Sequence, residues 1–188
     1  MNINQQLFKG QQIYLGPIDF EKDPEVESRW THSTAYHRAL GQKPAYPESP
    51  AAIKKRYEKM EKDAEEKRND FYMTIRANED GRLLGFVRIF WIEWAHGSGS
   101  LKMAIGDQAD RNKGYGSEAL RLALNYAFEE LNLFRLSIML GGDNPQAIQF
   151  FKKAGFVEEV RRREALHRDG QYYDVFHLGL LQDEWRPA

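Results

Sequence analysis

Apolar residues recur along this chain with two different periods. In QQIYLGPI (11–18), Ile13 and Leu15 alternate with other residues, which predicts a strand with one buried face. Over 115–132 the apolar residues return every three or four positions, which is the period of a helix. Its predicted buried stripe comprises Leu120, Ala123, Leu124, Ala127 and Leu131. Its predicted solvent-facing residues are Glu118, Arg121, Asn125, Glu129 and Asn132.

Two more helices are predicted in the first third of the chain. One begins at DPEVESRW, with Asp23 as its cap and Pro24 at the first helical position. The other covers 48–68 and is capped by Ser49. Its apolar stripe is narrow and consists of Ile53, Tyr57, Met60 and Ala64. Its many remaining charges indicate a solvated helix face rather than a docking surface.

The remaining elements are mainly strands. Apolar runs predict strands over 71–77, 82–94, 100–107 and 134–140, and a final strand pair within 156–181. Gly85 predicts a bulge, and Asp169–Gly170 predicts the turn of the final pair. NPQAIQFFKKAG predicts a short helix that begins at the cap Asn144 and ends at Gly155. The resulting order of elements predicts one α/β domain with a mixed sheet over residues 1–188.

Composition narrows the functional classes. The 188 residues carry a net charge of −1 and include no cysteine, so disulfides, thiolate metal sites and a cysteine nucleophile are excluded. The balanced charge argues against nucleic-acid binding, and RRREALHR (161–168) is interpreted as a solvated hairpin. MNINQQLFKGQQIYLG lacks the apolar core of a signal peptide, and no run is long enough to span a membrane. We therefore expect a cytoplasmic globular protein without a membrane partner.

The stretch RNKGYGSEAL places glycines and cations directly before the helix at 115. We name residues 111–117 the glycine loop. Its backbone N–H groups and the start of a helix form a site suited to phosphate. A P-loop does not fit, because Lys113 precedes Gly114 instead of following the second glycine. The dinucleotide pattern G-x-G-x-x-A does match, with Asp143 as a candidate ribose ligand, but DQADRNK separates it from the preceding strand.

A third interpretation accounts for more of the sequence. Arg111 to Gly116 fits R/Q-x-x-G-x-G/A, and NPQAIQFFKKAGF (144–156) fits N-x-x-A-x-x-x-(Y/F)-x-x-x-G-F. With both motifs in this order, the chain resembles the Gcn5-related N-acetyltransferase (GNAT) superfamily over nearly its whole length. The ending LGLLQDEW is similar to the Rim-type (RimJ/RimL-like) branch, which includes acetyltransferases of ribosomal-protein N-termini. The resemblance implies a mostly antiparallel sheet of about seven strands flanked by about four helices.

The resemblance also implies acetyl-CoA as co-substrate and assigns residues to it. The loop residues that would bind the pyrophosphate are Arg111, Asn112, Lys113, Gly114, Tyr115, Gly116 and Ser117. Backbone groups of Met103, Ala104 and Ile105 would pair with the pantetheine arm, beside a wedge between two diverging strands. Asn144 would contact the cofactor arm in addition to capping its helix. Phe151 occupies the position where the family often has a tyrosine that protonates the leaving thiolate.

The implied reaction moves an acetyl group directly from sulfur to a primary amine. A backbone N–H of 103–105 is the expected donor to the oxyanion. Asp107 and Glu93 are the candidate bases, although each also fits a surface carboxylate, and His177 fits a structural role on a late strand. At pH 7 an α-amine of pKa about 7.8 costs roughly 1 kcal/mol to deprotonate, whereas a lysine-like amine costs nearly 5. This favours N-terminal amines slightly.

The expected partner is therefore an amine acceptor, either a protein N-terminus or a small molecule such as a polyamine or an antibiotic. A CoA-binding module without catalysis is the alternative from another class, because Phe151 has no hydroxyl. The helices of 19–68 and the loop 91–99 are expected to select the acceptor. Family analogy alone suggests a homodimer. No histidine pair has the spacing of metal ligands, so no metal is expected.

Overall fold

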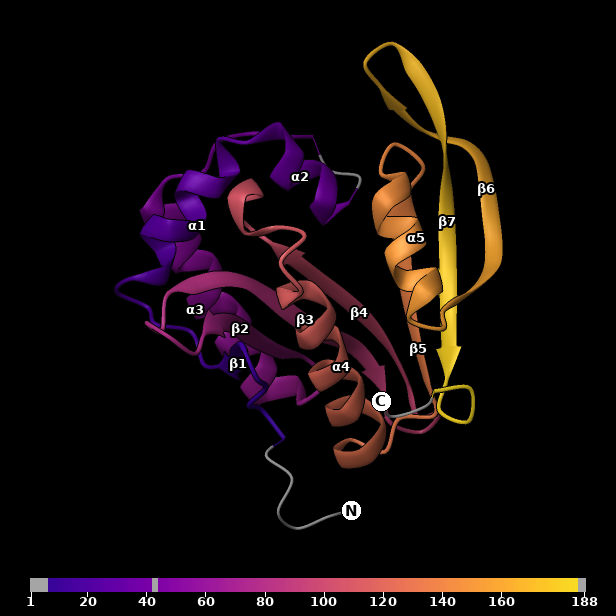
Figure 1. Ribbon diagram of the computed structural model, residues 1–188, viewed down its shortest axis with the longest axis horizontal. Helices are drawn as coiled ribbons and strands as arrows, with labels where there is room; N and C mark the ends of the chain where they lie inside the picture. Colours follow the sequence, from indigo (N-terminus) through magenta and orange to yellow (C-terminus); the bar gives the residue numbers. More distant parts are fainter. Residues whose placement is uncertain (1–6, 42–43, 186–188) are drawn as a thin grey trace.

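The computed structural model describes residues 7–41 and 44–185, which form seven strands and five α-helices (Figure 1). The first six and last three residues of the predicted domain, including the start of the N-terminal segment, lie outside this range. The strands are β1 (Ile13–Gly16), β2 (Phe71–Ala77), β3 (Leu83–Glu93), β4 (Ser98–Ile105), β5 (Arg135–Gly141), β6 (Val157–Arg168) and β7 (Gln171–Leu181). The helices are α1 (Asp23–Thr31), α2 (Thr34–Leu40), α3 (Pro50–Lys67), α4 (Tyr115–Asn125) and α5 (Pro145–Lys153).

All seven strands belong to one sheet, in the order β1-β2-β3-β4-β5-β7-β6. Every neighbouring pair is antiparallel except β4 and β5, which are parallel. The predicted mixed, mostly antiparallel sheet is thus confirmed. The register between β2 and β3 shifts next to Gly85, where the bulge is expected. Asp169 and Gly170 both have positive φ, of 50° and 72°, as the tight hairpin turn requires.

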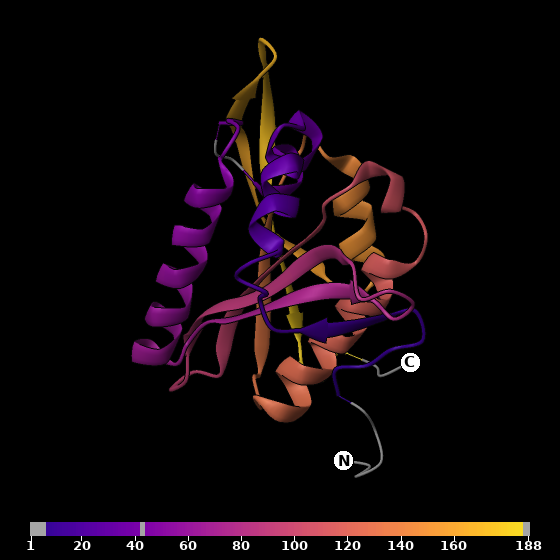
Figure 2. The same cartoon turned by 90° about the vertical axis from the view of Figure 1, so that its left-hand side faces the viewer.

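Helices cover both faces of the sheet (Figure 2). On one face α4 and α5 enclose the larger apolar core, which includes the fully buried Leu122, Phe128 and Leu136. On the other face α1 and α2 pack on β3 and β4 through a smaller cluster of Trp30, Tyr36, Leu83, Phe86 and Ala104. These two faces are called the α4–α5 face and the α1–α3 face below.

Two helices differ from their predictions. The helix α2 is not predicted, because TAYHRAL is only seven residues long and has no repeated apolar stripe. The helix predicted over 115–132 is regular only to Asn125, after which a π-helical turn covers Tyr126–Glu130. Asn125 is buried rather than solvent-facing, because the buried face of α4 includes both Leu122 and Asn125 before this turn.

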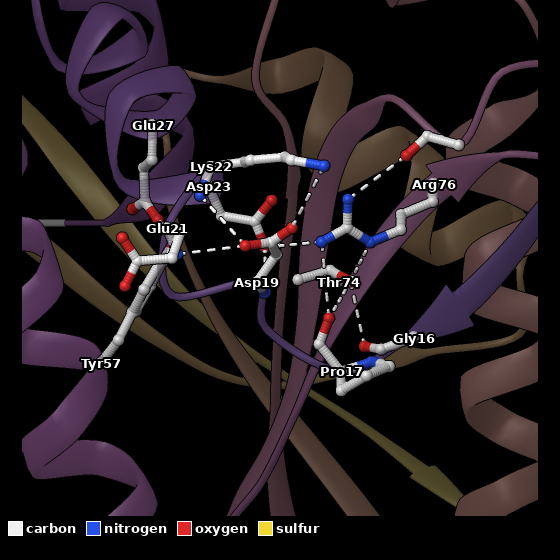
Figure 3. Close-up of polar contacts among 11 residues, drawn as sticks. Gly16, Pro17, Asp19, Glu21, Lys22, Asp23, Glu27, Tyr57, Thr74 and Arg76 are labelled. Carbon is white, nitrogen blue, oxygen red and sulfur yellow. Dashed lines mark hydrogen bonds and ion pairs between the residues drawn. The ribbon is translucent and has the colours of Figure 1, made fainter.

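The start of α1 is held by Asp19 rather than by the predicted cap, Asp23. The Asp19 carboxylate accepts from the backbone N–H groups of Glu21 and Lys22, and Asp23 is already the first helical residue. Asp23 is buried, where it accepts from the Asp19 N–H at 2.7 Å and pairs with Arg76 of β2 at 2.6 Å (Figure 3). The predicted cap of α3 is confirmed, because Ser49 Oγ accepts from the Ala52 N–H at 3.2 Å. No helix within the described ranges is long and apolar enough to cross a bilayer.

Candidate active site

The strands β4 and β5 diverge in the middle of the sheet (Figure 1), and we call the region between their diverging parts the wedge. Their ladder contains only three residue pairs, which join 98–100 to 135–137. At its last pair, Ser100 Oγ and Ser137 Oγ lie 3.3 Å apart, and the Ser137 hydroxyl also lies 3.3 Å from the Gly99 carbonyl oxygen. Beyond this apex the two strands diverge, so the later residues of β4 lack a partner strand on the β5 side.

Two of the three residues predicted on β4 direct backbone groups into the wedge. Gly106 donates its N–H to Leu84 O at 2.9 Å, and Ala104 stands opposite Phe86. Because antiparallel residues alternate between bonded and non-bonded pairs, Ala104 uses its backbone groups on β3. The N–H and C=O of Met103 and the N–H of Ile105 point the other way. Ala104 therefore borders the wedge without offering it a backbone hydrogen bond.

The glycine loop follows β4 and leads directly into α4. Gly114 is the N-cap and has a φ of 91°, which a residue with a side chain rarely adopts. The first helical hydrogen bond runs from the Glu118 N–H to Gly114 O at 3.0 Å. The N–H groups of Tyr115, Gly116 and Ser117 therefore precede the helical ladder and are available to an anion.

Gly116 leaves space rather than filling it. A Cβ added there would lie 3.8 Å from Ile105 Cγ1 and 3.9 Å from Phe150 Cζ, which are ordinary contact distances. Packing against the protein therefore does not require a glycine at this position. The absence of a side chain instead opens the start of α4 toward β4 and α5, where a ligand in the wedge would pass.

The two cations of the glycine loop contact the protein itself. Arg111 donates to the carbonyl oxygens of Ile105 and Gly106 at 3.3 and 3.2 Å, so it fixes the end of β4. Lys113 Nζ lies 3.4 Å from the carboxylate of Asp110, which also receives two hydrogen bonds from Arg82 at 2.6 and 2.9 Å. Hydrogen bonds from Arg82 are the main cause of the lowered pKa of Asp110. Sequence reasoning missed both Arg82 and Asp110.

Comparison with known proteins identifies the family. The model of the acetyltransferase (GNAT) domain matches residues 12–157. The chain belongs to the GNAT family. Spermidine N(1)-acetyltransferase of Vibrio cholerae is 30% identical over 103 residues, which cover 55% of this chain and 59% of that protein. The putative ribosomal N-acetyltransferase YdaF of Bacillus subtilis is 29% identical over 106 residues, or 56% of this chain and 57% of that protein. These matches span less than two thirds of either relative.

Two further GNAT relatives match over nearly their whole length. The probable N-acetyltransferase YjcK of Bacillus subtilis is 29% identical over 194 residues, covering 95% of this chain and 98% of that protein. The crystal structure of spermidine N-acetyltransferase from Vibrio cholerae in complex with CoA and spermine has a TM-score of 0.80 at 23% identity, covering 93% of this chain and 98% of that chain. At this identity the structural match establishes the shared GNAT fold.

The second GNAT motif forms the start and core of α5. Asn144 caps the helix, because its side-chain oxygen accepts from the Ala147 N–H at 3.1 Å, and this use leaves its side-chain NH₂ for another partner. Phe151 is only 4% exposed and packs edge-on against Phe150 and Phe156, with ring centroids 5.0 and 5.4 Å away. Phe151 is thus a core residue rather than one that lines an open site.

Neither predicted base lies free at the wedge. Asp107 is exposed and accepts from the Ala109 N–H at 2.9 Å, which caps a short 3₁₀ turn before the glycine loop. Glu93 stands opposite Ser98, so the length of β4 places it roughly 20 Å from Ile105. His177 lies on β7, and its buried Nε2 has no hydrogen-bond partner among residues 7–41 and 44–185, so this atom does not support the predicted structural role through a hydrogen bond. No three potential ligands within the described part of the chain gather into a metal site.

The α1–α3 face carries a buried polar cluster that sequence reasoning also missed. Glu27 accepts from the hydroxyls of Tyr36, at 3.0 Å, and Tyr57, and it pairs with Arg56 at 2.7 Å. Arg56 also pairs with Glu48 at 3.4 Å. Burial raises the pKa of Tyr36 and Tyr57 far above the usual value, so both phenols remain donors. This cluster joins α1, α2 and α3 above the sheet.

Proposed function

We propose that this GNAT protein transfers the acetyl group of acetyl-CoA directly to a primary amine. The observation that carries the proposal is the wedge, because it ends at three helix N–H groups that have no partner in the helix. Pyrophosphate suits these N–H groups, and the opening at Gly116 admits it. Acetyl-CoA supplies an activated thioester when it binds. The glycine loop and Asn144 are the residues that fit it here.

We assign different roles in the reaction to the residues around the wedge. The N–H groups of Met103 and Ile105 are the candidate donors to the thioester oxygen, and Asn144 would orient the cofactor arm. Since the glycine loop lies at the start of α4 on the α4–α5 face, we place the acceptor amine on the opposite, α1–α3 face. Phe151 supplies no acid, but a thiol of pKa near 8.5 leaves as a thiolate at a cost of about 2 kcal/mol at pH 7.

For the acceptor, we propose an α-amine such as a protein N-terminus, as in the Rim-type branch. Five carboxylates around the α1–α3 side are already paired with arginines: Glu27 and Glu48 with Arg56, Asp70 with Arg88, Asp143 with Arg168 and Asp169 with Arg38. A polyamine would have to displace these arginines to reach the carboxylates. An α-amine needs no such counter-charge and costs less to deprotonate.

A polyamine acceptor is the second candidate. It is favoured by the sequence likeness to spermidine N(1)-acetyltransferases of Vibrio cholerae and Escherichia coli. Loss of catalysis with retained CoA binding is the third and is favoured by Phe151. The dinucleotide interpretation has no free carboxylate for the ribose at Asp143, because this side chain is only 5% exposed and pairs with Arg168 at 2.6 Å.

The deciding experiment is a calorimetric titration with acetyl-CoA, with NADH as the control. We expect micromolar binding of acetyl-CoA and no binding of NADH. Gly116→Trp should fold and lose this binding, because the indole would occupy the opening at the start of α4. Gly116→Ala is the matched control, since its methyl group would make only ordinary contacts. Unchanged affinity in Gly116→Trp would contradict the assignment of the loop.

An acceptor panel then separates the candidates. The panel includes a lysine-containing tripeptide with a free α-amine and the same tripeptide acetylated at its α-amine, which leaves only the lysine amine. Acetyl transfer to the first peptide but not to the second supports an α-amine acceptor. Faster transfer to spermidine would replace this acceptor with a polyamine. Tight acetyl-CoA binding without transfer to either compound would favour the module without catalysis.

A further inference from the structure

Asp110 is a conspicuous residue to find beside a site for an anion. It is buried, it directly precedes the glycine loop, and the side chain of Lys113 links it to that loop. Charges act on one another over about 8–10 Å at physiological ionic strength, and further where water is excluded. An unneutralised carboxylate here would therefore oppose the binding of pyrophosphate at Tyr115 to Ser117.

Arg82 is the residue that neutralises it. Arg82 lies in the turn between β2 and β3, far from the glycine loop in the sequence, and its two Nη atoms donate to the two oxygens of Asp110. This bidentate geometry is the stronger form of a charge-assisted pair. Arg82 also lies 3.5 Å from Asp80. It is therefore held in place by a second carboxylate from its own turn.

We infer that Arg82 is a positioning residue for the cofactor, which neutralises Asp110 and sets the glycine loop for pyrophosphate. The inference rests on the proposed use of acetyl-CoA. It explains why both loop cations face the protein, since Arg111 fixes the end of β4 and Lys113 shares Asp110 with Arg82. The anion is then held by backbone N–H groups, and the surrounding ion pairs keep their electrostatic environment neutral or positive.

A double-mutant cycle on CoA binding tests the inference. Arg82→Met exposes the charge of Asp110 and should raise the calorimetric Kd of CoA about tenfold. Asp110→Asn should bind CoA at least as tightly as the unmodified protein, because Arg82 and Lys113 are then released toward the anion. The double variant should return to within about twofold of the unmodified Kd. The Arg82→Met defect should shrink as salt is raised.

Matched variants separate this role from stability. Arg88→Met removes a similar bidentate pair, which Arg88 of β3 forms with Asp70 and not with the glycine loop. This variant should leave the Kd of CoA unchanged. The charge-swapped variant Arg82→Asp with Asp110→Arg keeps the pair and should retain CoA binding. In steady-state kinetics, Arg82→Met should raise KM for acetyl-CoA and leave KM for the acceptor unaltered.

Two results would overturn the inference: an unchanged Kd in Arg82→Met, or a double variant that binds as weakly as Arg82→Met. If Arg82→Met does not fold, a weakened Asp110→Asn would overturn it equally. The proposed function fails separately, when the unmodified protein binds CoA and acetylates no amine. Absence of CoA binding by the unmodified protein would overturn both.

Discussion

On the α4–α5 face of the sheet, Leu122, Phe128 and Leu136 pack into one continuous apolar core, whereas the α1–α3 face depends on Glu27, Asp23 and their arginines. Apolar packing tolerates many side chains as long as volume is conserved. A buried carboxylate needs its partners at defined positions, because losing one leaves an uncompensated charge. The α4–α5 face is thus held mainly by apolar packing, whereas directional polar contacts hold the helices of the α1–α3 face together.

The largest effect is expected from opening the apolar core. Phe128→Ala should lower the free energy of unfolding by about 3–5 kcal/mol, because the side chain is fully buried and its loss leaves a cavity. Urea denaturation measures the change. Phe134→Ala is the control, since Phe134 is 54% exposed and should change stability by less than about 0.5 kcal/mol. Equal losses in the two variants would contradict the assignment of the core.

The α1–α3 face should lose stability when a single buried carboxylate is replaced by an amide. Glu27→Gln keeps the size of the side chain but leaves Arg56 with Glu48 as its acidic partner, so we expect a loss of about 2 kcal/mol in the free energy of unfolding. Glu21→Gln removes an exposed pair with Lys54 and should cost under about 1 kcal/mol. If Glu27→Gln left the free energy of unfolding unchanged, the tyrosine hydroxyls alone would be enough to hold the cluster together.

The side-chain caps of α3 and α5 allow the same substitution to be compared on the two faces of the sheet. Ser49→Ala and Asn144→Ala should each lower the free energy of unfolding by about 1 kcal/mol, because each removes one side-chain cap. Only Asn144→Ala should also weaken acetyl-CoA binding, since Asn144 is the proposed contact of the cofactor arm. Thermal melts and calorimetry on the same preparations separate the two effects. Equal affinities would leave Asn144 as a cap alone.

The smallest expected effect is one of pH. The pKa of Asp110 is lowered by Arg82, so its stabilising contribution is present above its ordinary pKa of about 3.8 and is lost as the pH falls through the lower, folded-state value. Burial raises the pKa of Asp23, which gives the opposite sign. Between pH 5 and pH 3, the decline in urea midpoint should become shallower in Asp110→Asn and steeper in Asp23→Asn. We expect differences below about 1 kcal/mol.

Sequence reasoning predicted the elements well where the chain carries local signals. Ser49, Asn144, Gly155 and the Asp169–Gly170 turn all act through neighbours a few residues away, and the structure places each as expected. The helix α2 is flanked by Ser33 and Gly41, but its seven residues carry no repeated apolar stripe that would predict it. Asp23 fits a cap by residue type, but its carboxylate is used by Arg76, 53 positions later in the chain.

The candidate site was predicted in outline for the same reason. The glycine loop is a local motif, so its position at the start of α4 follows from its sequence. The contacts of its side chains cannot be predicted from this motif, because Lys113 shares Asp110 with Arg82, which comes from another hairpin. The register of β4, which separates Met103 and Ile105 from Ala104, likewise depends on pairing with a distant strand. Such pairings lie beyond any pattern within one segment.

The three-residue ladder between β4 and β5 has a mechanical consequence. It joins two blocks of strands, β1 to β4 and β5 to β6, that are each bonded internally over longer ladders. A force pulling these blocks apart would load few backbone hydrogen bonds at this seam, and more at the neighbouring β3–β4 and β5–β7 ladders. The β4–β5 ladder is thus where the sheet should separate first under force, and a ligand bound across the proposed cofactor site would raise the force needed.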